Sequence, residues 1–335
     1  MFGFEGRIWI WTCALSIAGS WAPAALAVAQ RTFVASFGAD TNPCSITAPC
    51  RSFATAIGNT SVLGEVIVLD SAGYGPVTIT TSVSITAPPG VYAGIFVPSG
   101  VTGVTVNGGA VVALRGLTIN GQGNGAGGID FKQGGRLNIE NCLITNILGT
   151  GILLEASTTH TYITDTTVRY SAPGIQITDG QATIDRVHLE NNANGGLRIS
   201  TASSVPIVAV VRDSVMSLNG QSGFTVTTSA TQTARLVVER SVATGSTSGF
   251  IAGGTGTTTL IIRDSSAVEN SQSGIVADSP SGITTVVVSG STSSRNGGRG
   301  FEQNGVAGFR TLQNNTVESN ALGPTVGVIT NANLQ

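Results

Sequence analysis

An apolar residue recurs along this chain at spacings of 21 to 27 residues, and this repeat limits the possible folds more than any other feature. The recurring residues, called phase residues here, are Ile139, Ile163, Ile184, Val211, Val238, Ile262, Val288 and Leu312. Each lies in a short segment rich in β-branched residues, and a glycine–hydrophobic pair begins eleven or twelve residues later. The pairs are Gly151-Ile152, Gly174-Ile175, Gly196-Leu197, Gly223-Phe224, Gly249-Phe250, Gly274-Ile275 and Gly300-Phe301. Such self-similarity is typical of a solenoid, and β-branched segments broken by Gly, Asn and Ser predict strands as the repeated element.

Charged residues also follow the repeat. Two positions after successive phase residues lie alternating acids and arginines, a charge column of Asp165, Arg186, Asp213, Arg240 and Asp264. The neighbouring set Asp185, Arg212, Glu239 and Arg263 alternates in the same way. Opposite charges in register on stacked coils would neutralise one another, so we interpret the column as a structural ladder rather than a row of catalytic acids. If it is exposed, removing one arginine should cost little; if it is buried, the cost should be several kcal/mol.

A third column is polar and uncharged. Seven or eight residues after the phase residue the chain has Asn146, Asn191 or Asn192, Asn219, Asn270, Asn296 and Asn320, with Ser171 and Ser246 in the gaps. Asparagine tolerates left-handed backbone angles and can hydrogen-bond a stacked neighbour, which favours a repeated corner. A sugar-binding polar row is the alternative.

Composition excludes several classes of protein. Only 10% of the residues are charged, 45 are glycine and the net charge is -2, so neither a disordered tail nor a helical fold is expected. Beyond residue 29 the chain has a single lysine, Lys132, which argues against binding of a nucleic acid backbone.

The first 29 residues have the features of a signal peptide. Arg7 precedes an apolar stretch, and Ala27-Val28-Ala29 places small residues before Gln30 as a signal peptidase requires. No later segment approaches the length of about 20 apolar residues needed to span a bilayer. We therefore predict a protein exported to the periplasm or beyond, with about 306 of its 335 residues remaining.

With this repeat, the chain resembles secreted bacterial right-handed parallel β-helix proteins of the pectin-lyase-like superfamily. The segment RTFVASFGADTNPCSITAPCRSFATAI, from Arg31 to Ile57, is similar to the opening of many such proteins. The resemblance implies an all-β solenoid of about ten coils over residues 64–335, preceded by a cap over residues 30–63. That cap is expected to contain a first strand, a disulfide loop and a short helix over 51–59, with Phe53, Ala56 and Ile57 facing the core. Asp40 in this segment either closes a turn or binds a cation, and the turn is favoured.

Cysteine usage agrees with export. Cys44 and Cys50 flank a short loop containing Pro49, and we pair them as a disulfide rather than as metal ligands because no histidine lies near them. Cys142 is left unpaired and is interpreted as a small buried residue, since a catalytic thiol needs a nearby base and the chain has only His160 and His188. We predict no metal site from these residues.

Candidate ligand-contacting residues follow the glycine–hydrophobic pairs. If the hydrophobic member points inward, alternate residues beyond it point outward on stacked coils. The resulting candidate patch consists of Asp130, Lys132, Glu155, Gln176, Asp179 and Arg198. The alternative is a solvated face with weak ion pairs.

Three functions are compatible with these observations. The favoured one is a non-catalytic binding or structural solenoid that contacts polysaccharide or the cell envelope, without a cofactor. The second is a polysaccharide lyase-like enzyme acting on acidic glycans, for which calcium would be expected, and the third is an adhesin-like passenger. The Asn-Thr-Asp, Asp-Asp, Gly-His-Gly and Arg-Ile-Lys signatures of related hydrolases are missing, which argues against that branch. The pattern indicates no particular oligomeric state.

Overall fold

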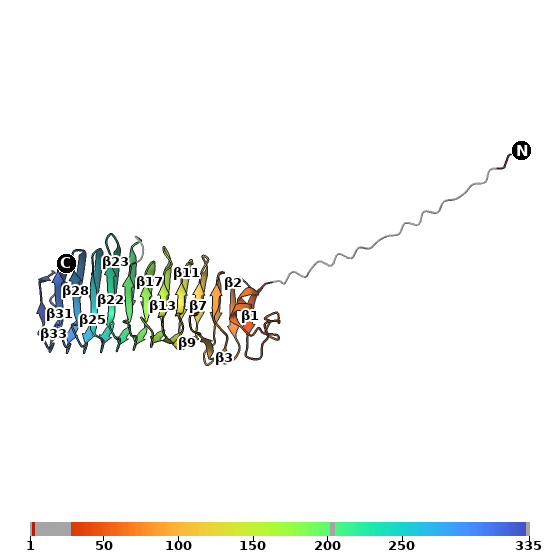
Figure 1. Cartoon of the computed structure of the whole chain (residues 1–335), viewed down its shortest axis with the longest axis horizontal. Coiled ribbons are helices and arrows are strands. Elements are labelled where there is room, and N and C mark those ends of the chain that lie inside the picture. Colours follow the sequence, from red (N-terminus) through yellow and green to blue (C-terminus); the bar gives the residue numbers. More distant parts are fainter. Residues whose placement is uncertain (1, 4–27, 202–204, 333–335) are drawn as a thin grey trace.

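A computed structural model describes residues 2–3, 28–201 and 205–332 (Figure 1). Most of the predicted signal peptide, residues 4–27, lies outside the described residues, and so do all three tryptophans. In the described part the chain winds into a stack of coils along one long axis (Figure 1).

Three parallel sheets, A, B and C, form the walls of this stack within the described ranges. Sheet A contains β1 (Ala29–Val34), β2 (Thr60–Val68), β5 (Val83–Thr86), β8 (Val111–Arg115), β11 (Arg136–Glu140), β14 (His160–Thr164), β17 (Gln181–Asp185), β20 (Ile207–Arg212), β23 (Thr233–Glu239), β26 (Thr257–Arg263), β29 (Ile283–Ser289), β32 (Gly308–Thr311) and β35 (Ile329–Asn331). Sheet B contains β3 (Ala72–Gly73), β6 (Ala93–Phe96), β9 (Leu117–Asn124), β12 (Leu143–Ile147), β15 (Thr167–Arg169), β18 (His188–Glu190), β21 (Val215–Ser217), β24 (Val242–Thr244), β27 (Ser266–Val268), β30 (Thr292–Ser294) and β33 (Thr316–Glu318). Sheet C contains β4 (Val77–Ile79), β7 (Thr102–Val106), β10 (Gly127–Phe131), β13 (Thr150–Leu154), β16 (Ile175–Ile177), β19 (Leu197–Ser200), β22 (Ser222–Thr228), β25 (Ser248–Gly254), β28 (Ile275–Ser279), β31 (Phe301–Gly305) and β34 (Thr325–Val326).

Each coil contributes one strand to A, then B, then C, and pairs in parallel with the coils before and after it. The predicted parallel β-helix is therefore confirmed. The phase residues from Ile139 to Val288 lie on sheet A and the hydrophobic members of the glycine pairs on sheet C, and both sets are buried. Leu312 is an exception, because it lies just after β32 and Thr311 takes the place opposite Val288. Some core residues also stack on each other from coil to coil, as Phe224 and Phe250 do with ring centroids 4.7 Å apart. Burial of these side chains on every coil supplies the main driving force for folding.

A helix covers the amino-terminal end of the stack (Figure 1). Helix α1 (Phe53–Gly58) buries Phe53, Ala56 and Ile57, the residues predicted to face the core. The Ser52 hydroxyl accepts a hydrogen bond from the Thr55 amide at 3.3 Å and caps the helix. Strands β1 and β2 already belong to sheet A, so the cap segment is continuous with the solenoid.

The loop before α1 is closed by a disulfide and by Asp40. Cys44 and Cys50 form the predicted disulfide, with Cα atoms 4.6 Å apart. The Asp40 carboxylate accepts hydrogen bonds from the amides of Arg51 and Ser52, each at 2.9 Å. Burial opposes its ionisation, but these amides and the Ser52 hydroxyl outweigh burial and lower the pKa of Asp40. Asp40 therefore ties its loop to the residues that precede α1, through long-range hydrogen bonds rather than the local turn that the sequence predicted.

The charge column lies at the corner between sheets A and B, and all five of its residues have left-handed backbone angles. Their φ values lie between 46° and 51° for Asp165, Arg186, Asp213, Arg240 and Asp264. Arg186 pairs with Asp165 at 2.7 Å and Arg240 with Asp213 at 2.7 Å, and these side chains are about half exposed. The second set also pairs across coils, with Arg212 and Arg263 both contacting Glu239. The ladders lie on the surface, so we expect the removal of one of their arginines to lower the stability of the fold only slightly.

The asparagine column lies at the corner between sheets B and C and is buried there. Its buried members are Asn192, Asn219, Asn270, Asn296 and Asn320, with Ser171 and Ser246. The asparagines and Ser246 each accept a hydrogen bond from the backbone amide one coil earlier, as Asn219 Oδ1 does from Asn192 N at 3.0 Å. Buried side chains cannot contact a sugar, so the corner interpretation holds for them. Asn146 and Asn191 instead occupy the preceding left-handed bend, and Ile147 takes the buried place beside Asn146.

A second buried ladder, which the sequence analysis missed, lies beside the charge column. The hydroxyl of Ser214 accepts from Val187 N at 3.1 Å, and Ser241, Ser265 and Ser291 repeat the contact on later coils. Both ladders satisfy corner amides that have no partner within a sheet.

The third corner, between sheets C and A, is where coil length varies. From the phase residue to the buried residue of sheet C the spacing is always 12 or 13 residues, as from Ile139 to Ile152. From sheet C back to the next phase residue it ranges from 9 to 14. The irregular repeat therefore arises at one edge of the solenoid, called the C–A edge here. Variable loops on a rigid scaffold are the usual place for function.

The two kinds of ladder should differ in their effect on stability. Asn270→Ala removes the acceptor for the Ser246 amide and the donor to the Ala243 carbonyl, both at buried positions. We expect it to lower the free energy of unfolding by about 1–3 kcal/mol, measured by urea denaturation. Arg240→Ala, at an exposed ion pair, is the control and should change little. An equal loss in both variants would contradict this assignment.

Candidate functional site

The predicted patch lies on the outer face of sheet C, next to the C–A edge. Asp130, Leu153, Gln176 and Arg198 occupy one register position on four consecutive coils. Lys132 and Glu155 lie two positions beyond Asp130 and Leu153 and begin the loops that follow β10 and β13. The predicted alternation thus places these side chains on one outer face.

Asp130, Lys132 and Glu155 form a compact charged cluster. Lys132 Nζ lies 3.3 Å from Asp130 Oδ2, and the lysine side chain is half exposed whereas the aspartate is nearly buried. The other carboxylate oxygen, Asp130 Oδ1, is buried and has no hydrogen-bond partner among the described residues. A buried acceptor without a donor is costly, and a hydrogen bond from a protonated Glu155 to Asp130 would reduce this cost.

Glu155 is the group most affected by this surrounding. Partial burial, together with the charge of Asp130, raises the pKa of Glu155, and Lys132 opposes this only in part. When Glu155 carries a proton, its carboxyl group can donate a hydrogen bond to Asp130. Glu155 is therefore the acid of this cluster that keeps its proton to a higher pH than an isolated carboxyl group would.

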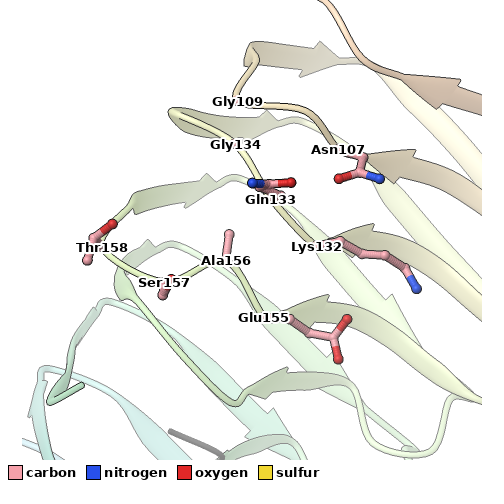
Figure 2. Close-up of a pocket in the computed structure, with 9 residues that line it drawn as sticks. All are labelled: Asn107, Gly109, Lys132, Gln133, Gly134, Glu155, Ala156, Ser157 and Thr158. Atoms are coloured by element: carbon pink, nitrogen blue, oxygen red, sulfur yellow. The ribbon is translucent and has the colours of Figure 1, made fainter. Parts of the chain in front are cut away.

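An open hollow of about 520 Å³ lies beside this cluster, and we call it the edge pocket. It is lined by Asn107, Gly109, Lys132, Gln133, Gly134, Glu155, Ala156, Ser157 and Thr158 (Figure 2). Asn107, Lys132 and Glu155 follow one another from coil to coil, and the lysine and glutamate side chains project to the same side (Figure 2). Gly134 keeps its loop close to the core, since a Cβ there would come within 2.2 Å of the Phe131 ring.

The remaining predicted residues do not join the cluster. Leu153 separates Gln176 from Asp130, and the Gln176 amide instead donates to the Ser200 hydroxyl at 3.2 Å. Arg198 lies one coil further on. Asp179 is nearly buried, and its carboxylate accepts from the Gly180 amide at 2.8 Å because the chain turns there with a φ of 79°. The alternation of inward and outward side chains along the strand does not continue through that turn, so it could not place Asp179.

The sequence analysis missed the polar residues of the loops, Asn107, Gln133, Ser157 and Thr158. The variable spacing between sheet C and the next phase residue marks these loops and was a usable signal. Strand alternation could not place them, because it applies only within the strands.

Other nucleophile and ligand candidates lie away from this pocket. Burial raises the pKa of the Cys142 thiol to about 11, which fits a structural cysteine. His160 contacts the Thr183 hydroxyl on sheet A, and His188 is exposed on sheet B. Within the described ranges, no three residues among His, Cys, Asp and Glu are grouped closely enough to hold a metal ion. No helix in the described part of the chain has the length and apolarity needed to cross a membrane.

Three solved structures are similar to this solenoid. The A-module of the mannuronan C-5 epimerase AlgE6 from Azotobacter vinelandii matches with a TM-score of 0.54 and 14% identity, over 82% of this chain and 92% of that one. The pectate lyase Pel9A matches with a TM-score of 0.51 and 16% identity, over 87% of this chain and 79% of that one. A rhamnogalacturonan lyase matches with a TM-score of 0.50 and 14% identity, over 89% of this chain and 84% of that one. At these identities the likeness shows the fold alone.

Sequence comparison gives a consistent result. A search of curated proteins finds no match. The family model described as "Right handed beta helix region" matches residues 60–209 and 173–333, which together cover most of the chain. The protein therefore belongs to the right-handed β-helix family.

Proposed function

We propose that the protein is an exported, non-catalytic β-helix that binds acidic polysaccharide in the edge pocket. The observation that carries the proposal is the Asp130–Lys132–Glu155 cluster beside an open polar hollow. Lys132 is exposed enough to contact a sugar carboxylate while it remains paired with Asp130. The two acids accept hydrogen bonds from sugar hydroxyls, and the amides of Asn107 and Gln133 add further donors and acceptors.

Two further observations support this proposal. The similar structures are named for activities on pectate, mannuronan and rhamnogalacturonan, and an acidic polysaccharide is the ligand we transfer from those names. The Cys44–Cys50 disulfide suits an oxidising compartment such as the periplasm or the extracellular space, as the amino-terminal segment also predicts. Contact with the cell envelope belongs to the same proposal.

A second candidate function is a polysaccharide lyase-like enzyme that uses the same cluster. The observation that favours it is the raised pKa of Glu155, because a carboxylic acid that keeps its proton to higher pH is suited to general acid catalysis. Lys132 is already engaged in an ion pair with Asp130, an arrangement that suits contact with a sugar carboxylate better than the abstraction of a proton. Binding is therefore the better-supported function, and calcium is expected only for the enzyme.

Binding should depend on the cluster. A glycan array probed with the protein, with and without calcium, should identify acidic polysaccharides. Lys132→Ala and Glu155→Ala should each weaken binding of the strongest ligand by about tenfold or more, since a hydrogen bond to a charged group contributes about 1.5–3 kcal/mol. Arg240→Ala and Glu318→Ala remove the same charges at distant exposed positions and serve as controls. A ligand that binds both pocket variants unchanged would show that the edge pocket is not the site.

The same ligands distinguish binding from catalysis. We expect no rise in the ultraviolet absorbance of unsaturated sugar ends and no new chain ends when the protein is incubated with them, with or without calcium. A calcium-dependent rise that Glu155→Gln abolishes would favour the lyase-like function instead.

The raised pKa of Glu155 should also appear in the pH dependence of stability. Below the ordinary value of 4.5, Glu155 is protonated in both the folded and the unfolded chain. As pH rises from there through the higher folded pKa, the unfolded chain releases this proton first, and the folded protein loses stability. Glu155→Gln mimics the protonated acid, so its thermal midpoint should exceed that of the wild type by more near about pH 7 than near about pH 4. Glu318→Gln is the matched exposed control. If the difference in thermal midpoint between Glu155→Gln and the wild type does not grow with pH, this would argue against the raised pKa of Glu155.

A further inference from the structure

A second hollow lies on the outer face of sheet A, away from the edge pocket. It has a volume of about 340 Å³ and is lined by Arg136, Asn138, Glu140, Tyr162 and Thr164. These residues come from β11 and β14, where Asn138 lies directly opposite Tyr162 and Glu140 opposite Thr164. We call this hollow the β11–β14 platform.

The ring of Tyr162 is held in place but remains accessible. His160 packs against it with ring centroids 4.4 Å apart, and the guanidinium carbon of Arg136 lies 5.9 Å from its centroid. His160 is itself fixed by a 3.0 Å hydrogen bond to the Thr183 hydroxyl. The tyrosine side chain is nevertheless 38% exposed. A rigid, partly exposed aromatic ring is a suitable surface for the apolar face of a sugar.

Two polar groups beside this ring have no partner in the described structure. Asn138 Oδ1 is buried without a hydrogen bond. Among the described residues Arg136 has no carboxylate within ion-pair distance, whereas the nearby Glu140 is paired with Arg115 at 2.8 Å. The platform therefore combines an aromatic surface, an unpaired cation and an unsatisfied acceptor. A solvated surface would not need to bury an unsatisfied acceptor.

We propose that the platform is a second glycan-binding site and that it takes a uronate residue. The sugar ring lies on Tyr162 and its carboxylate pairs with Arg136. The contacts are independent of the edge pocket, but the choice of a glycan as ligand rests on the proposed function.

The position of the platform relative to the edge pocket supports a joint role. Strand β11 begins directly after the pocket loop 132–135, and β14 begins after the pocket loop 155–159. The two hollows thus lie on either side of the same loops. A polymer that reaches both sites gains affinity because the second contact becomes intramolecular.

The test measures binding of two soluble probes, oligogalacturonate and its methyl-esterified form, by titration calorimetry. Tyr162→Ala should weaken binding of both probes by about tenfold, and Tyr162→Phe should restore it because stacking needs the ring and not the hydroxyl. Arg136→Gln should weaken binding of the acidic probe only, since esterification removes the carboxylate. Tyr170→Ala is the control, because Tyr170 is also exposed and lies beside an arginine, Arg169, but follows β15 of sheet B, away from the platform.

The outcomes separate the two proposals. Loss of binding in Lys132→Ala and Glu155→Ala, with Tyr162→Ala and Arg136→Gln unchanged, would overturn the platform and leave the proposed function standing. Loss only in the platform variants would support the platform and remove the edge pocket as the site. Weaker binding in both sets would support both sites. A wild-type protein that binds neither probe would overturn the uronate ligand for both.

Discussion

The structure depends on how the corner amides of each coil are satisfied. Within the three sheets every strand between the two end strands pairs with the coil before and the coil after it, but at a bend the backbone turns away from those partners. At two corners a buried side chain of the next coil supplies the missing acceptor, asparagine between sheets B and C and mostly serine between sheets A and B. An acceptor shifted by one residue would leave a buried amide unsatisfied, so these ladders set the register in which all later strands stack.

The charge column follows from the same corners. Asp165, Arg186 and the other members have left-handed backbone angles, which cost a residue with a Cβ about 1–2 kcal/mol. Gly116, Asn141 and Gly290, which occupy the same corner position on other coils, adopt this conformation more readily. Where charged residues stand instead, bidentate pairs such as Arg240 with Asp213 offset part of that cost. The Arg186 guanidinium and the Arg240 guanidinium lower the pKa values of Asp165 and Asp213 respectively, as expected for carboxylates held by such pairs.

The features of this structure that recur with the coil repeat could be predicted from the sequence, and those that do not recur could not. The phase residues and the glycine–hydrophobic pairs recur because every coil must bury the same positions, so fold, coil order and core could be predicted. Alternation also brought Asp130, Lys132 and Glu155 to one face. It was insufficient for Asp179, where a turn at Gly180 interrupts the strand, and for Gln176, which Leu153 separates from the cluster. The orphan oxygens of Asp130 and Asn138 depend on side-chain packing between coils, which no one-dimensional pattern contains.

The location of both hollows follows from a structural difference among the three corners of the solenoid. On the coils from Ser171 onward, two corners are filled by ladders that keep the number of residues constant, and an insertion there would break a chain of buried hydrogen bonds. The C–A edge carries no such ladder over the coils that form the pocket, so its loops can differ from coil to coil without cost to the register. Lys132 and Glu155 begin two of these loops, and Arg136 and His160 follow their ends. Chemistry that varies between coils is therefore most easily accommodated at this edge, and the unsatisfied oxygens of Asp130 and Asn138 lie on the two faces that meet there.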